Sequence, residues 1–116
     1  MKLYHATTKD AAQRAWNDGF NGGDAWNYLK DVVFFADRPL EGFGGWSECW
    51  IEIEIPDELA EKNDLYQEYE KGWDEGQYKA KCFVFKAKFV NQPEIINTMK
   101  IHEKNPKEEE SEDGLY

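Results

Sequence analysis

The sequence predicts a small α+β domain with a split antiparallel β-sheet core and two main helices. Three observations support this class. The length of 116 residues suits one domain, short apolar or alternating segments are interleaved with two helix-like segments, and the connections near residues 46 and 56 are short enough to predict antiparallel neighbours. We expect one domain over residues 1–102 and a disordered tail over residues 103–116, because the tail is acidic and too charged to pack.

The first strand and helix form the clearest local unit. Residues 2–6 (KLYHA) are typical of a short strand, with Leu3 and His5 on one face. Thr8 follows, and its hydroxyl can accept a hydrogen bond from a free amide of the first helical turn. We therefore predict that Thr8 caps a helix over residues 9–18.

The helix has an apolar stripe and a clear stop signal. Ala12, Ala15 and Trp16 recur at helical spacing, which predicts the face that packs against the core. Gly19 suits the left-handed residue that closes a helix, and Phe20 suits the apolar contact that follows it.

A central strand and a glycine-rich loop follow a predicted loop at residues 21–24 and an ambiguous turn or strand at residues 25–30. Residues 32–35 (VVFF) form a short apolar run, which predicts a strand buried on both faces. Pro39 stops it, and three glycines then surround Phe43. The loop is interpreted as a ligand pocket or, alternatively, as a tight connection with Phe43 packed over the core.

The next strand, residues 47–55, alternates between apolar and polar side chains. Glu52 and Glu54 fall on the polar face, where we expect them to be solvated. Asp57 is the predicted cap of a second, acidic-faced helix that continues to about Trp73.

Residues 78–89 are typical of one long strand with a buried middle, followed by a turn at residues 91–93 and a short strand at residues 99–102. Cys49 and Cys82 match no metal or redox spacing, so each is predicted to be a buried, reduced thiol in a strand; the alternative is a single disulfide.

Charge limits the function classes. The net charge is −10, so nonspecific nucleic-acid binding is not expected, although lysines near residues 79–88 allow a local basic patch. Residues 57–75 carry eight acidic and two basic side chains, which indicates either a solubilising face or a surface for a basic protein partner. No apolar run approaches the ~20 residues of a membrane helix, and the N-terminus lacks a signal-peptide pattern, so we expect a cytoplasmic location without a membrane.

Few motifs carry chemistry. The patterns GxGxxG, Walker A, HExxH and GxSxG are absent, and two histidines with two scattered cysteines do not form a zinc site. His102 is expected on the surface beside the tail. His5, next to a helix start, suits a ligand with hydroxyls or phosphates; the alternative is a satisfied core residue.

Two motifs carry a resemblance to a known family. The strand LYHATT, followed by a helix, a Gly-Phe pair and the strand VVFFAD, resembles the start of the ADP-ribosyltransferase-like fold. In its poly-ADP-ribose polymerase and diphtheria-toxin branch, the first strand reads aromatic-His-Gly-Ser/Thr and a later strand reads Gly-Ile-Tyr-Phe-Ala. The chain is also similar to small uncharacterised bacterial and phage proteins with a Phe/Ser-Asp-Arg-Pro-Leu run. The resemblance covers roughly the first half of the chain.

The resemblance implies NAD as substrate and a set of binding residues. His5 matches the histidine that holds a ribose hydroxyl, and Thr7 a Ser/Thr that supports this ribose. Ala6 matches the glycine whose main chain binds the nicotinamide amide. Phe34 matches the tyrosine that packs near nicotinamide but lacks its hydroxyl, and Phe43 is the candidate second stacking ring.

The resemblance also implies a catalytic glutamate near the start of a late strand. Glu75 is the first candidate and Glu94 the second; if Gln77 occupies the position, a neutral amide would replace the carboxylate. The implied function is transfer of ADP-ribose from NAD to an unknown acceptor. The alternatives are a catalytically inactive nucleotide- or protein-binding module of the same fold, and an acidic interaction or inhibitor protein.

Overall fold

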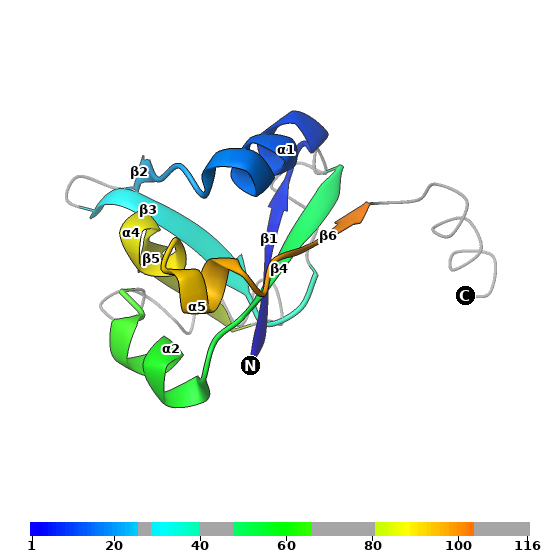
Figure 1. The fold of residues 1–116 in the computed structure, drawn as a ribbon. Coiled ribbons are helices and arrows are strands. Elements are labelled where there is room, and N and C mark those ends of the chain that lie inside the picture. Colours follow the sequence, from blue (N-terminus) through cyan, green and yellow to red (C-terminus); the bar gives the residue numbers. More distant parts are fainter. Residues whose placement is uncertain (26–28, 40–47, 66–80, 104–116) are drawn as a thin grey trace.

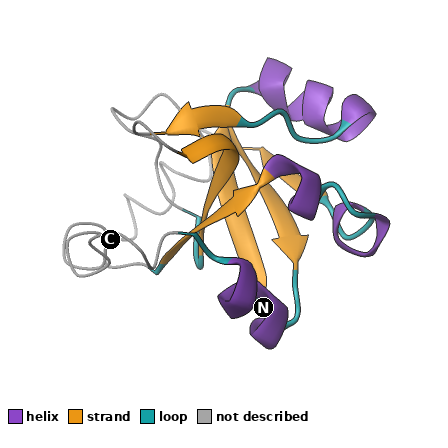
Figure 2. Ribbon diagram, turned by 90° about the vertical axis from the view of Figure 1, so that its left-hand side faces the viewer, coloured by secondary structure: helices purple, strands orange, loops and turns teal. Residues whose placement is uncertain are grey.

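The computed structural model describes residues 1–25, 29–39, 48–65 and 81–103 and confirms a small α+β protein. Its strands form one six-stranded sheet in which every described pairing is antiparallel (Figure 1). The helices gather on one side of the strands (Figure 2). No helix within the described ranges is both long enough and apolar enough to cross a bilayer.

The described elements are, in chain order, β1 (Lys2–Thr7), α1 (Lys9–Asp18), β2 (Gly23–Ala25), β3 (Leu29–Ala36), β4 (Cys49–Glu54), α2 (Asp57–Asn63), β5 (Cys82–Lys86), α4 (Ala87–Val90), α5 (Pro93–Ile96) and β6 (Lys100–Glu103).

The sheet is divided into two halves that meet at β1 and β3. The strand order is β2-β3-β1-β4-β6, and β5 pairs with β3. β1 pairs with β4 over six residues, whereas it meets β3 at the single pair Tyr4 and Ala36. The predicted adjacency of the strands on either side of residue 46 is wrong, because β1 lies between β3 and β4.

The start of α1 follows the sequence prediction. Thr8 is the N-cap, and its Oγ1 accepts a hydrogen bond from the Ala11 amide at 3.2 Å. Ala12 and Ala15 are buried as predicted. The prediction is wrong for Trp16, since 56% of it is exposed. The buried residues of α1 are the two alanines.

Gly19 ends α1 in a conformation that differs from the predicted left-handed helical one. Its φ is 86° but its ψ is 174°, a region that essentially only glycine adopts. A Cβ at this position would also lie 2.9 Å from Oδ1 of Asn91. That amide accepts from the Phe20 N–H at 2.7 Å and donates to the Phe20 carbonyl at 2.9 Å. Phe20 is buried, as predicted.

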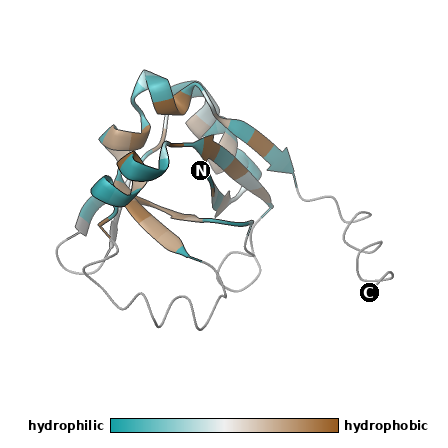
Figure 3. Cartoon of the chain, turned by 90° about the horizontal axis from the view of Figure 1, so that it is seen from below, coloured by the Kyte–Doolittle hydropathy of each residue, from teal (hydrophilic) through white to brown (hydrophobic). Residues whose placement is uncertain are grey.

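The core lies between the sheet and the helices. The alternation of β4 is confirmed on its inner face, and the hydrophobic colouring of the strands in Figure 3 reflects this core. Complete burial of one large apolar side chain, such as that of valine, leucine, isoleucine or phenylalanine, contributes about 1.5–3 kcal/mol to the free energy of unfolding. The largest fully buried side chains are Phe83, Phe85, Leu3, Ile51, Ile53, Ile55, Ile95, Val84, Val90 and Cys49.

β3 is not buried along both faces. Val32, Val33 and Phe35 are buried, but Phe34 is 37% exposed, so the prediction of burial on both faces is wrong at this residue. The predicted loop at residues 21–24 is also shorter than expected, because residues 23–25 pair with β3 as β2.

The end of the predicted long strand is helical, and its predicted start, residues 78–80, lies outside the described residues. β5 ends at Lys86, and α4 follows at once. The helical turn brings the centroid of the Phe89 ring to 5.1 Å from that of the Phe85 ring. In a continued strand these two residues would share a face but lie four residues, about 13 Å, apart along the chain, too far for their rings to pack. The predicted turn at Asn91 is present, but the sequence interpretation missed α5, whose Pro93 occupies the first turn.

α2 begins as predicted but with a different cap. Pro56 is the N-cap residue, and Asp57 lies inside the first turn. Its carboxylate accepts from the N-terminal amine of Met1 at 3.0 Å instead of capping the helix. The described part of α2 ends at Asn63, so the predicted continuation to Trp73 lies outside the described residues.

The last strand is confirmed as β6. It extends to Glu103, which the sequence interpretation had placed in the acidic tail, because Glu103 pairs with Cys49 of β4. The rest of the predicted tail, residues 104–116, lies outside the described residues.

We expect Gly19→Ala to lower the free energy of unfolding by about 1–3 kcal/mol, through backbone strain and contact with the Asn91 amide. Gly23→Ala is the matched control, because a Cβ there meets no atom within 4 Å. Urea denaturation of both variants measures the difference. Equal denaturation midpoints for the two variants would show that the backbone conformation at Gly19 and its closeness to Asn91 do not require glycine.

Candidate functional site

His5 lies where the two halves of the sheet separate. Its Nδ1 is 2.7 Å from the main-chain oxygen of Phe34 on β3. A carbonyl oxygen can only accept a hydrogen bond, so Nδ1 must carry the proton of this contact. In the neutral ring Nε2 is then an acceptor.

The surroundings of His5 favour its neutral form. Its ring packs edge-on against Phe20 at 6.0 Å and at a tilt against Phe35 at 5.6 Å, measured between ring centroids. The residue keeps partial solvent exposure although protein atoms surround it densely. This burial lowers the pKa of His5 below its ordinary value of 6.5, while the hydrogen bond to Phe34 opposes the shift. At neutral pH the ring therefore donates a hydrogen bond from Nδ1 to the protein and keeps Nε2 as an acceptor.

The main chain next to His5 faces the same separation. The carbonyl of Thr7 accepts from the Glu48 N–H at 2.9 Å, so the main-chain groups of Thr7 point toward β4. Successive residues of a strand direct these groups to opposite sides. Those of Ala6 therefore point toward β3, just past the single β1–β3 pair. The Thr7 side chain is buried.

Phe34 and His5 come together through the Phe34 main chain. Because side chains alternate along β3, the Phe34 ring lies on the face opposite Phe35. Phe35, which the sequence interpretation did not single out, is the β3 ring that contacts His5. Its signal was present in the sequence: His5 shares an inward face with Leu3, and an inward residue meets inward residues of the next strand.

No carboxylate of the described residues forms a hydrogen bond or an ion pair with His5. Glu94 is exposed on α5, and neither a hydrogen bond nor an ion pair joins it to His5. Burial and the Phe34 carbonyl account for the shift in the pKa of His5, with no acidic side chain contributing within the described parts of the chain. Glu75 and Phe43 lie outside the described residues, as does Gln77.

An open groove of about 590 Å³ lies between the end of α1 and α5. Gly19 and Asn91 line it, and both contact or adjoin Phe20, whose ring packs on His5. The lining residues are Trp16, Asn17, Asp18, Gly19, Asn91, Ile96, Asn97 and Met99.

A second polar contact joins β4 to β6. Glu52 was expected to be solvated, but it is only 5% exposed, and its Oε1 lies 2.9 Å from Nε2 of His102. The His102 ring remains half exposed, as a surface histidine should, and packs 6.3 Å from the Tyr4 ring. Alternation along one strand could not reveal this pair, because it depends on the register between β4 and β6.

The cysteines and acidic groups do not form a metal centre in the described part of the chain, where no cluster of three or more His, Cys, Asp or Glu side chains occurs. Cys49 is buried, as predicted, and its thiol donates to the Thr8 carbonyl at 3.5 Å. Burial raises the pKa of this thiol, and the charges of Glu103 and Glu48 add to the shift. Cys82 is only partly buried, so the prediction of burial is wrong for it.

Comparisons with protein-family models, with curated proteins and with solved structures give no match for this chain. The geometry around His5 and the sequence motifs are therefore the basis for a functional proposal.

The lowered pKa of His5 predicts a pH dependence of stability. Protonation favours the unfolded chain, so the contribution of the neutral ring is fully present above pH 6.5 and is lost as the pH falls through the lower pKa of the folded state. We expect wild type to lose more stability than His5→Asn between pH 7.5 and pH 5. Urea denaturation at both pH values measures this; parallel losses would contradict it.

Proposed function

We propose that this chain binds NAD with His5 as a ribose-contacting residue and transfers ADP-ribose to an acceptor. The observation that supports this most directly is the orientation of His5. Its Nδ1–H is donated to the Phe34 carbonyl, so Nε2 of the neutral ring is left as an acceptor on a residue that is partly exposed to solvent.

The acceptor character of Nε2 favours a hydroxyl-bearing ligand. A ribose hydroxyl can donate to Nε2, whereas a fully ionised phosphate oxygen cannot, because it has no proton to give. The main-chain groups of Ala6 are directed toward the same separation, where an amide such as that of nicotinamide could pair with them. Both features agree with the roles that the sequence resemblance implies.

Transfer of ADP-ribose requires one further group. The bond between the nicotinamide nitrogen and the ribose C1′ breaks, nicotinamide leaves with the electron pair, and positive charge develops on the ribose. The acceptor then forms a bond to C1′ and loses a proton. A carboxylate near the ribose stabilises the developing charge, and Glu75 and Glu94 are the candidates.

A second candidate function is nucleotide binding without transfer. It is favoured by the absence, among the described residues, of an acidic side chain that influences His5. Under this alternative, the orientation of His5 would serve recognition of the ribose alone.

Two substitutions of His5 separate the roles of its nitrogens. Asn places an amide nitrogen near the position of Nδ1, so His5→Asn can keep the Phe34 contact while removing the Nε2 acceptor. His5→Gln reaches the Nε2 position but gives up the Phe34 contact. We expect His5→Asn to weaken NAD binding at least about tenfold, the cost of about 1.4 kcal/mol, and His5→Gln to weaken it less.

Calorimetric titration with NAD measures these affinities, and urea denaturation shows that each variant is folded. His102→Asn is the matched control, because His102 lies on β6 and contacts Glu52 rather than the separation of β1 and β3. NAD binding that is unchanged in His5→Asn would falsify the proposal.

Release of nicotinamide distinguishes transfer from binding alone. We expect Glu75→Gln or Glu94→Gln to reduce the rate about 100-fold while NAD affinity stays within a few-fold, because the carboxylate acts on charge that develops only in the transition state. Glu58→Gln, an exposed residue of α2, is the control. Wild-type protein that binds NAD but releases no nicotinamide would instead support the binding module.

A further inference from the structure

The groove between α1 and α5 combines an exposed aromatic ring with a negative electrostatic environment. Trp16 is the most exposed large hydrophobic side chain of the described residues, and it lines this groove rather than the core. Ile96 and Met99 add apolar surface. An exposed indole at the wall of a groove offers a flat face for a ligand to cover.

The end of α1 makes the groove attractive to a cation. The C-terminal end of a helix carries a partial negative charge from its free carbonyl groups. The last turn of α1 has no basic residue to balance it, and Asp18 adds a full negative charge at the same place. No lysine or arginine is among the described residues that line the groove.

The amides of the groove supply further acceptors. Asn97 lies at the end of α5 and is exposed, and Asn17 is exposed on α1. Asn91 is already occupied, because its amide forms both hydrogen bonds to Phe20. The groove therefore offers the carboxylate of Asp18 and the amide oxygens of Asn17 and Asn97 beside the indole of Trp16. Asn91 lines the groove but is held by Phe20.

We propose that this groove binds an arginine side chain of a basic peptide or protein partner. A guanidinium group is planar, stacks on an indole face and presents several donors to carboxylate and amide oxygens, whereas a lysine ammonium does not stack. The net charge of −10 favours approach of such a partner over long distances. This site is distinct from the NAD site proposed at His5.

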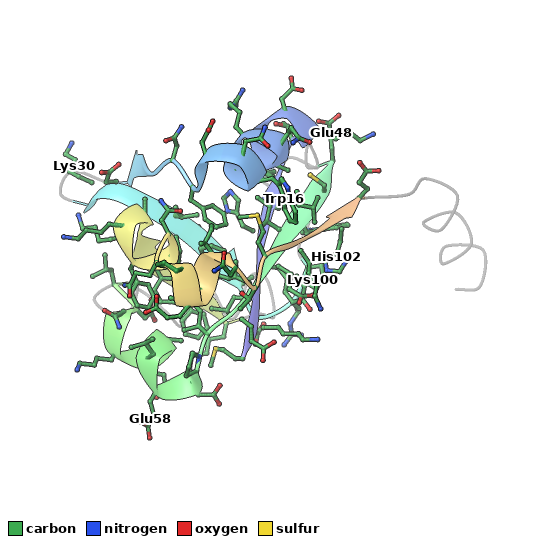
Figure 4. All side chains as sticks on the ribbon, in the orientation of Figure 1. Trp16, Lys30, Glu48, Glu58, Lys100 and His102 are labelled. Carbon is green, nitrogen blue, oxygen red and sulfur yellow. The ribbon has the colours of Figure 1, made fainter. Side chains whose placement is uncertain are left out.

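Two pairs of variants test the proposal, and each pair compares a change in the groove with the same kind of change on α2. Trp16→Ala is paired with Leu59→Ala, which removes another exposed hydrophobic side chain on α2. Asp18→Asn is paired with Glu58→Gln, which removes one negative charge on α2, far below Trp16 in the view of Figure 4. All four residues are exposed, and Asp18→Asn also removes an unfavourable charge from the end of α1, so the fold is expected to persist.

The probe is a capped hexapeptide of alternating glycine and arginine, with its lysine counterpart, titrated at 150 mM salt. Binding is followed through the backbone amide signals of Gly19 and Asn97, groove residues that every variant retains. In wild-type protein it is also followed through the indole N–H signal of Trp16, which is identified among the five tryptophans by its loss in Trp16→Phe. We expect Trp16→Ala to weaken arginine-peptide binding about fivefold and Asp18→Asn about threefold. The controls should change it less than about twofold, and His5→Asn should leave it unchanged.

The proposal fails if the arginine peptide does not bind, or if Leu59→Ala and Glu58→Gln weaken it as much as their partners do. Equal binding of the lysine peptide would contradict recognition of a guanidinium group. A shift of the Trp16 signal by adenosine but not by the peptide would assign the groove to a nucleobase instead. Loss of NAD binding in His5→Asn with peptide binding retained would separate the two sites.

Discussion

The junction between β1 and β3 is the constraint on which the rest of the structure depends. β1 is tied to β4 along its whole length but meets β3 at one pair of residues. The imidazole of His5 bridges to the main chain of β3 just beyond that pair. The His5 side chain thus links β1 to β3 where no backbone pairing does. The result is a polar ring between the two halves of the sheet, whose Nε2 has no hydrogen-bond partner among the described residues.

The packing around Phe20 links this junction to the helical side of the molecule. Phe20 contacts His5 through its ring, while its main chain is held by the Asn91 amide. That contact requires Gly19 to bring the backbone close to Asn91. The end of α1, the turn after α4 and the wall of the groove are therefore positioned by one set of contacts. A ligand in the groove and a ligand at His5 would share this support without sharing residues that bind them.

Glu52 shows how register can override alternation. Its strand has the polar face expected for solvent, yet the carboxylate is buried and hydrogen-bonded to His102. A buried carboxylate is costly without a partner. β6 supplies the partner by pairing with β4, so the contact also favours one register of an edge strand whose own side chains are mostly exposed.

The sequence by itself determined the class of fold and the elements with strong local signals. Thr8 caps α1 because its hydroxyl reaches a local amide, and the apolar face of β4 follows from alternation with a period of two. It also singled out His5. Tertiary structure decided what local patterns cannot encode: which strand lies beside which, the α4 turn that packs Phe89 on Phe85, and the burial of Glu52. These depend on contacts between residues distant in the chain, where packing and register outweigh local propensity.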